Sequence, residues 1–176
     1  MKFNLNQTTD ILERTPGVIH ALLYNAGDHW TQGNEGAETW SPHNVLGHLI
    51  HCDGYNWLPR IRLILSDRAI KKFEAFDRFA HLENDKSKNI NQLLYDFAAI
   101  RIRSLAELKA LNISDEHLQR TAMHPDLGKI TLAELIATWL VHDLDHLSQI
   151  SRVMAKQYTA EVGPWKRYMR ILNPNL

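Results

Sequence analysis

Residues 131–158 read TLAELIATWLVHDLDHLSQISRVMAKQY and predict the longest helix of the chain. Thr131 and Glu134 have the spacing of a capping box, which satisfies free amide groups at the start of a helix. Beyond them, one stripe of residues recurs every three or four positions, the spacing of a helical face that packs into a core. The stripe comprises Leu135, Trp139, His142, His146, Ile150 and Val153. Two histidines therefore lie on the predicted buried face.

Three further segments show the helical spacing of apolar residues. The first begins near Ile11 and contains Thr15-Pro16, which predicts a kink or a split because proline donates no helical hydrogen bond. The second opens with Ser41-Pro42, a serine N-cap followed by a first-turn proline, and Pro59 is expected to kink or end it. The third runs from about Ser87 to Leu111.

The segments between these helices show no convincing strand alternation, so no strand is expected. Asn25–Thr39 predicts a glycine-rich loop, and Ser66–Lys86 predicts an irregular connection whose phenylalanines pack against the helices. His124–Gly128 has the composition of a turn, and Trp165–Leu172 predicts a short C-terminal helix. Four long amphipathic helices bury their stripes only by packing together. The sequence therefore predicts an all-α four-helix bundle, with residues 1–176 as a single domain.

The composition argues against several functional classes. Twenty basic residues balance twenty acidic ones, so broad electrostatic binding to nucleic acid or to an anionic membrane is not expected. Cys52 is the only cysteine, which excludes a disulfide within the chain. Neither a secretory signal nor a membrane-spanning run is recognisable, and the cytoplasm is the predicted location. The unusual feature is the presence of ten histidines among 176 residues.

His142 and His146 are four residues apart on the predicted helix, so their imidazoles lie over one another and can share a metal ion. Imidazole nitrogen suits zinc, nickel, copper or iron. The alternative is a pair of structural core histidines, each of which then needs a buried hydrogen-bond partner. The spacing alone leaves both interpretations open, because a chain with this many histidines readily contains such a pair by chance.

His48 lies on the predicted buried face of the second helix. With His142 and His146 it makes three inward histidines on two helices that must pack together. Three protein ligands and one open position are typical of catalytic zinc sites. His51 is the competing third ligand on the second helix. Cys52, one turn beyond His48, is near enough to approach the site, although a small core residue is the simpler interpretation.

Two motifs resemble those of the DinB-like family. Trp40-Ser41-Pro42, Val45 and His48-Leu49 are similar to the family motif that supplies the first metal ligand. Thr138–His146, followed by Gln149-Ile150, is similar to the motif that supplies the other two ligands. Further stretches resemble one subgroup of the family, and these are residues 11–16, 57–60, 124–125, 157–158 and 162–165. The resemblance spans nearly the whole chain.

This resemblance implies a DinB-like four-helix bundle, often a homodimer. It also implies that His48, His142 and His146 hold a divalent metal ion, with zinc and nickel as the favoured metals. Characterised relatives include bacillithiol S-transferases and mycothiol-dependent maleylpyruvate isomerases. They imply a small-molecule substrate, a low-molecular-weight thiol as co-substrate, and metal-assisted thiol transfer, with hydrolysis by an activated water as the close variant. The alternative is a bundle that binds a metal or a ligand without turnover. No nucleic-acid or membrane partner is implied.

A second enzymatic interpretation is a zincin protease, because residues 142–146 resemble the H-E-x-x-H motif. Aspartate replaces the catalytic glutamate here, and only Glu161 is available as a downstream ligand. Asp143 and Asp145 are expected either to face solvent or to support the metal ligands from outside. The sequence thus identifies no catalytic acid or base and no substrate-binding residue.

Four other side chains have two interpretations each. Arg60 and Arg101 are expected as solvated or paired surface arginines, with contact to an anionic substrate as the alternative. His124 is expected to be exposed in its turn or to lie at the rim of the site. Trp139 is expected in the core, with a place in the lining of the site as the alternative.

Overall fold

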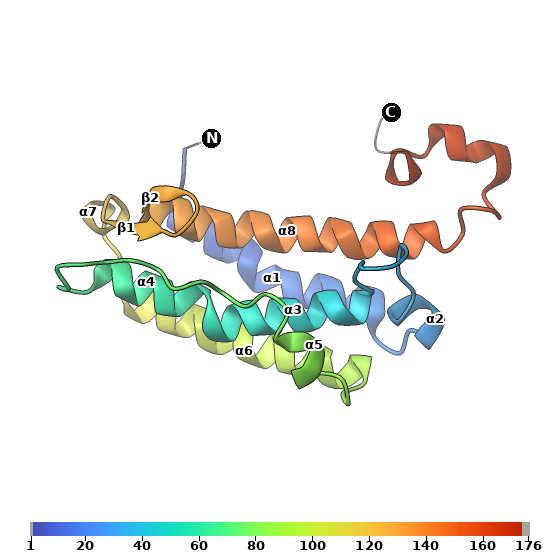
Figure 1. Ribbon diagram of the computed structural model, residues 1–176, viewed down its shortest axis with the longest axis horizontal. Helices are drawn as coiled ribbons and strands as arrows, with labels where there is room; N and C mark the ends of the chain where they lie inside the picture. Colours follow the sequence, from blue (N-terminus) through green and yellow to red (C-terminus); the bar gives the residue numbers. More distant parts are fainter. Residues whose placement is uncertain (1, 174–176) are drawn as a thin grey trace.

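Four long helical rods run side by side along the computed structural model, which describes residues 2–173 (Figure 1). The rods are α1 (Leu5–Leu23), α3 (Pro42–Tyr55) continued by α4 (Trp57–Leu65), α6 (Ile90–Ala110) and α8 (Leu132–Lys156). The predicted four-helix bundle is therefore confirmed. Within the described residues, no helix combines the length and the hydropathy needed to cross a membrane.

In cross-section, each of the four rods occupies one corner of the bundle. α6 packs against α1 and α3, and α8 packs against the same two helices. α6 and α8 therefore occupy opposite corners, and α3 faces both of them. This arrangement brings the second and the last rod together, which the site requires.

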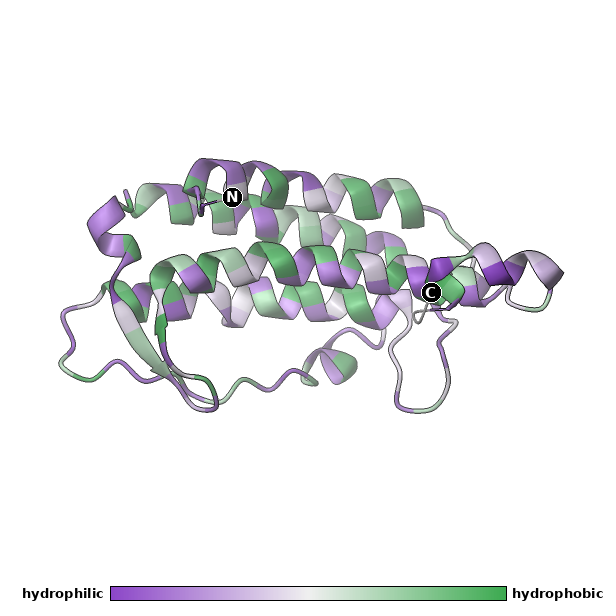
Figure 2. Ribbon diagram, turned by 90° about the horizontal axis from the view of Figure 1, so that it is seen from above, coloured by the Kyte–Doolittle hydropathy of each residue, from purple (hydrophilic) through white to green (hydrophobic). Residues whose placement is uncertain are grey.

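The apolar core is divided into two clusters along the bundle, and apolar positions line the inward faces of the rods (Figure 2). One cluster gathers around Trp57, Ile61 and Trp139, and the other gathers around Leu46, Phe97 and Ile150. Buried polar side chains gather near the junction of the two clusters, among them His48, Asp53, Arg101, Asp143 and His146. A group of buried polar and charged side chains thus lies within the largely apolar interior.

α1 is one uninterrupted helix, so the predicted split at Thr15-Pro16 is wrong, and its N-cap is Asn4. Pro16 has no amide hydrogen to donate to the carbonyl of Leu12, four residues earlier. Arg101 on α6 donates to that carbonyl instead, from Nη1 at 2.8 Å. A side chain from a neighbouring helix therefore satisfies the acceptor that proline leaves free.

The second rod begins and breaks as its sequence predicts. Ser41 and Asn44 form a reciprocal cap at the start of α3, with side chain-to-amide distances of 3.3 and 3.2 Å. The rod breaks at Asn56, between α3 and α4. Pro59 explains the break, because it has no amide to donate to the carbonyl of Tyr55, the last residue of α3.

The expectation of no strand is wrong for one short hairpin. β1 (Thr121–His124) and β2 (Gly128–Thr131) pair antiparallel at the end of the bundle where α7 (Asp115–Leu118) lies (Figure 1). The predicted turn joins them. Four residues are too few to display an alternating pattern, so the strands depend on pairing that the sequence does not reveal. The predicted capping box of Thr131 and Glu134 then starts α8.

The other connections are mostly irregular. α2 (Asp28–Thr31) lies in the predicted loop, and α5 (His81–Asn84) lies in the predicted irregular connection. In that connection, Phe73 is buried and Phe76 is partly buried, as expected, whereas Phe79 is 49% exposed, so the expectation fails there. The predicted C-terminal helix is found as two 3₁₀ helices, Gly163–Tyr168 and Arg170–Leu172.

Candidate metal centre

His48 on α3 and His142 and His146 on α8 bring their imidazoles together between the two helices. Nε2 of His142 lies 3.2 Å from Nε2 of His48 and 3.2 Å from Nε2 of His146. One donor atom from each ring lies within 4.8 Å of the others. The three histidines chosen from the sequence thus form one cluster, and their role as metal ligands stays a prediction.

The opposite ring nitrogens of two of these histidines have partners outside the cluster. Nδ1 of His146 lies 2.7 Å from Oε1 of Gln149, and Nδ1 of His48 lies 3.3 Å from the carbonyl oxygen of Arg78. Each contact turns Nε2 towards the other histidines. Nδ1 of His142 is buried and has no hydrogen-bond partner among residues 2–173. The cluster is therefore only partly satisfied by the protein.

The three imidazoles are neutral at pH 7. Burial, together with repulsion from the neighbouring rings, lowers the pKa of His48 to about 3 and the pKa of His142 to about 3. Burial also lowers the pKa of His146, against the opposing effect of its hydrogen bond to Gln149. Neutral imidazole is the form that binds a metal ion.

The donor chemistry fits a divalent cation. An imidazole Nε2 carries either a hydrogen or a lone pair, so three of them converging on one point cannot all be satisfied by one another. A cation accepts three lone pairs at once, and three neutral nitrogens suit zinc, nickel, copper or iron. The residues present therefore fit such an ion.

Aromatic rings and one thiol surround the cluster. The ring of Trp40 lies 4.8 Å from that of His48, and the ring of Trp57 lies edge-on to His142 at 5.2 Å. Sγ of Cys52 lies 3.4 Å from Nε2 of His48 and 3.9 Å from Nε2 of His142. Burial raises the pKa of the Cys52 thiol well above its usual value, so the thiol stays protonated at neutral pH.

His51, the competing ligand, and His124 both lie outside the cluster. Nε2 of His51 is 3.0 Å from the carbonyl oxygen of Asp77, and its ring stacks on Phe76, so it is not part of the cluster. Nδ1 of His124 accepts hydrogen bonds from the amides of Asp126 and Leu127 and thereby closes the turn of the hairpin. His124 has a local structural role that its position in a turn did not reveal.

Arg101 is not the surface residue that the sequence suggested: it is 1% exposed. It forms a bidentate ion pair with Asp53 of α3, at 2.6 and 3.1 Å, and another with Asp143 of α8, at the same two distances. Its remaining hydrogen bond is to Leu12 of α1. Trp139, which is fully buried as expected, donates from Nε1 to Asp53 at 3.1 Å. We call Asp53, Arg101, Trp139 and Asp143 the Arg101 network.

Sequence reasoning missed Asp53, and of the two alternatives given for Asp143 the solvent-facing one is wrong, because both carboxylates are buried. A signal for Arg101 was present. It lies on the apolar stripe of α6, four residues after Phe97 and three before Ser104. A charge at a stripe position indicates a buried ion pair, because a long charged side chain is almost never fully buried without a partner.

The model of one protein family, the DinB superfamily, matches residues 11–150 of the chain. The chain belongs to the DinB superfamily. This confirms the resemblance carried by the Trp40–Leu49 and Thr138–Ile150 motifs.

Among solved structures, YfiT from Bacillus subtilis is similar to this DinB-superfamily chain, with a TM-score of 0.74 and 19% sequence identity over 86% of each chain. YfiT is described as a probable metal-dependent hydrolase with an unusual four-helix bundle topology. At this level of identity, the similarity shows a shared fold. No curated protein matches the chain.

Proposed function

We propose that the protein is a metal-dependent enzyme in which His48, His142 and His146 hold a divalent cation, zinc or nickel. The observation that carries the proposal is the convergence of three neutral imidazoles from two helices, with donor atoms within 4.8 Å of one another. Membership of the DinB superfamily supports it. When bound, the cation supplies a Lewis acid that lowers the pKa of a thiol or of water.

The protein's own residues prepare the ligands. Gln149 and the carbonyl of Arg78 orient His146 and His48 through their Nδ1 atoms, which leaves Nε2 free for the cation. Outer partners of this kind fix the orientation of metal-binding imidazoles. Burial keeps all three rings neutral, and Trp40 shields His48 from water.

The reaction that we propose is transfer of a low-molecular-weight thiol to an electrophilic small molecule. The three neutral imidazoles would hold the cation without offsetting its charge, so the cation would acidify a thiol or a water bound to it. A thiol has a pKa of about 8.5 against about 15.7 for water, so it ionises more readily there. In the metal-free protein, burial keeps the Cys52 thiol protonated. The proposal therefore assigns the reacting thiol to a separate co-substrate.

Hydrolysis is the second candidate. The observation that favours it is the similarity to YfiT, which is described as a probable metal-dependent hydrolase. The same three histidines would hold the cation, and water would take the place of the thiol. A homodimer in the cytoplasm is part of the proposal, and light scattering across micromolar concentrations tests the dimer.

The test combines metal analysis with activity. Protein purified without a nickel-affinity step is expected to contain about one divalent ion per chain. Bacillithiol, mycothiol, glutathione and cysteine are then screened against a model electrophile, with metal-free and metal-loaded protein in parallel. Metal-dependent conjugation that is lost in His142→Ala supports thiol transfer, and metal-dependent cleavage of an ester or amide supports hydrolysis. Absence of bound metal, with no uptake on titration at neutral pH, contradicts both.

A further inference from the structure

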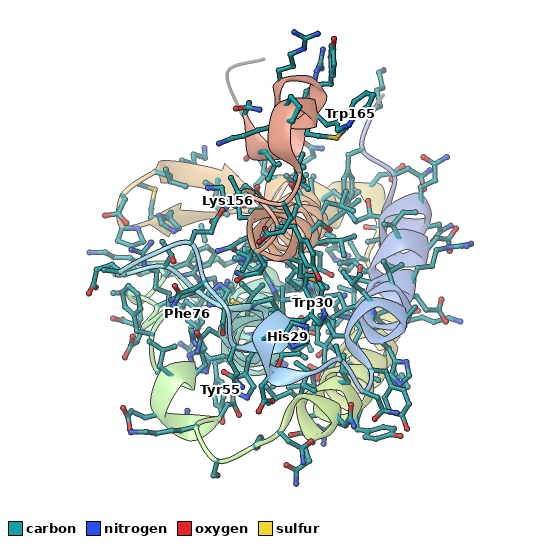
Figure 3. All side chains as sticks on the ribbon, turned by 90° about the vertical axis from the view of Figure 1, so that its right-hand side faces the viewer. His29, Trp30, Tyr55, Phe76, Lys156 and Trp165 are labelled. Carbon is teal, nitrogen blue, oxygen red and sulfur yellow. The ribbon has the colours of Figure 1, made fainter. Side chains whose placement is uncertain are left out.

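A cavity lies on the flank of the bundle, between α4 and residues 68–76, which cross that helix. Its volume is 530 Å³, within the range of small-molecule sites. Tyr55 and Phe76, which both line it, lie on the same flank in the end-on view of Figure 3. Its other apolar lining residues include Leu63, Ile70 and Phe73. None of the proposed metal ligands lines this cavity.

The charged lining of the cavity is mainly cationic. The cavity is lined by three cationic residues, Arg60, Arg68 and Lys72, and by one acidic residue, Glu74. Such a surface favours an anionic ligand, since complementary charge steers and holds the partner. The apolar residues beside it favour a ligand with an apolar body.

Arg60 is the cation whose environment points to a ligand. It is half-buried, and within residues 2–173 no carboxylate oxygen lies within 4.0 Å of its guanidinium. Its contacts are the ring of Phe73, 4.8 Å from the guanidinium carbon, and a long hydrogen bond of 3.4 Å to the carbonyl of Glu74. A partly desolvated guanidinium usually has a carboxylate or phosphate partner with which it pairs in a bidentate manner.

Arg62 provides the contrast on the same helix. Two residues along α4, it points away from the cavity and pairs with Glu107 of α6. The chain therefore pairs one arginine of α4 and leaves the other facing a cavity.

Asn56 supplies the second, independent observation. Asn56 lines the cavity and is 7% exposed, and among residues 2–173 its buried Oδ1 has no hydrogen-bond partner. An unmade hydrogen bond of this kind is destabilising unless a ligand or water satisfies it. Rotation of the carboxamide by about 180° exchanges Oδ1 and Nδ2, so Asn56 offers either an acceptor or a donor at this position.

We propose that this cavity binds a small organic carboxylate: the guanidinium of Arg60 and the amide Nδ2 of Asn56 donate to the carboxylate, and the apolar body of the ligand packs against Phe73 and Phe76. The cavity adjoins the histidine cluster at the start of α4: Trp57, next to Asn56, packs on His142. Binding needs no metal, because the lining residues are not metal ligands. Its failure is therefore distinguishable from a failure of the proposed function.

The experiment uses 4-phenylbutyrate and 4-phenylbutanamide, which share an apolar body and differ in charge. Each is titrated into the full-length, ¹⁵N-labelled protein in a buffer free of carboxylate and phosphate, and the side-chain signals of Asn56 and Trp57 are followed. The carboxylate is expected to bind at least about tenfold more tightly than the amide, as hydrogen bonds to a charged group are worth about 1.5–3 kcal/mol. The result is expected to be the same with and without metal.

Arg60→Met is expected to reduce the affinity for the carboxylate to that for the amide, whereas Arg62→Met leaves both unchanged. Asn56→Asp adds a negative charge and is expected to weaken carboxylate binding alone. If Asn56→Asp does not fold, the matched pair of arginine variants still decides. Equal affinities for the two probes, no binding of either at millimolar concentration, or equal effects of Arg60→Met and Arg62→Met would overturn the proposal.

Discussion

The histidine cluster and the Arg101 network both join α3 to α8, the second through Arg101 of α6, but they differ in how far their polar groups are hydrogen-bonded. Every N–H of the Arg101 guanidinium has an acceptor: Asp53 and Asp143 take two each, and Leu12 takes the fifth. The three histidines mostly face one another, and Nδ1 of His142 has no partner among the described residues.

The difference separates a structural group from a binding group. A buried polar network that is fully satisfied joins helices and has nothing left to offer a ligand. A buried cluster that its own protein leaves unsatisfied is destabilising by itself, and binding a ligand offsets that cost. The Arg101 network therefore holds α1, α3, α6 and α8 in register, while the histidine cluster between two of these helices is available for a metal ion.

The largest expected effect is on stability. Arg101→Met leaves Asp53 and Asp143 buried without a counterion, and breaking such a pair costs about 3–5 kcal/mol. Urea unfolding of the metal-free protein measures the loss. The control is Arg62→Met, which breaks the exposed pair with Glu107 and is expected to cost at most about 1 kcal/mol. Similar losses in the two variants would contradict a special role for the buried network.

The next effect is on metal affinity. His48→Ala removes one of three proposed ligands and is expected to weaken binding by more than about 100-fold, since loss of outer partners alone costs about 10–100-fold. His142→Ala and His146→Ala are expected to do the same. Titration with a zinc-competing chelator measures the affinity. His51→Ala, three residues along the same helix, is the control, and a larger loss in His51→Ala than in His48→Ala would show that the wrong histidine was chosen.

The two regions are expected to change the free energy of unfolding in opposite directions when the pH is lowered. The folded pKa of His48 and that of His142 lie near 3, below the unfolded value of about 6.5. Between these values the unfolded chain binds more protons, so the metal-free protein is expected to lose about 2 kcal/mol per histidine from pH 7 to pH 5. Urea unfolding at the two pH values measures this loss, and a flat profile would contradict it.

Asp53 opposes this trend. Burial raises its pKa to about 6, with Arg101 only partly offsetting the effect. Between its unfolded value of about 3.9 and pH 6, the folded state binds the additional proton, so acidification stabilises this region. Asp53→Asn removes this stabilising effect of acid, so the loss of unfolding free energy between pH 7 and pH 5 is expected to be larger in the variant. An unchanged slope would show that Asp53 does not titrate in this range.

The smallest expected effect concerns an outer partner of the cluster. Gln149→Leu removes the hydrogen bond to Nδ1 of His146 and is expected to weaken metal binding by about tenfold, without loss of the folded state. Gln157→Leu is the matched control, because Gln157 lies at the C-terminal end of α8 and its side chain bonds, among the described residues, only to the carbonyl of Val153. Equal affinities in the two variants would mean that Gln149 does not orient His146.

Local signals in the sequence predicted local structure well. The caps at Ser41 and Thr131 are found where their motifs place them, and the break of the second rod follows from Pro59. The prediction at Pro16 failed because the partner of Leu12 lies on another helix. The hairpin was missed since strands of four residues depend on pairing rather than on an internal period.

The sequence by itself determined the four amphipathic helices and the presence of His48, His142 and His146 on their inward faces, because helical periodicity acts over three or four residues. Only the tertiary structure decided the partners of Arg101, since Asp53 and Asp143 lie 48 and 42 residues away in the chain. Only the tertiary structure likewise decided the cavity beside Arg60, because residues 68–76 line it from across α4. Contacts between distant segments depend on how the rods pack, and no pattern within one rod encodes them.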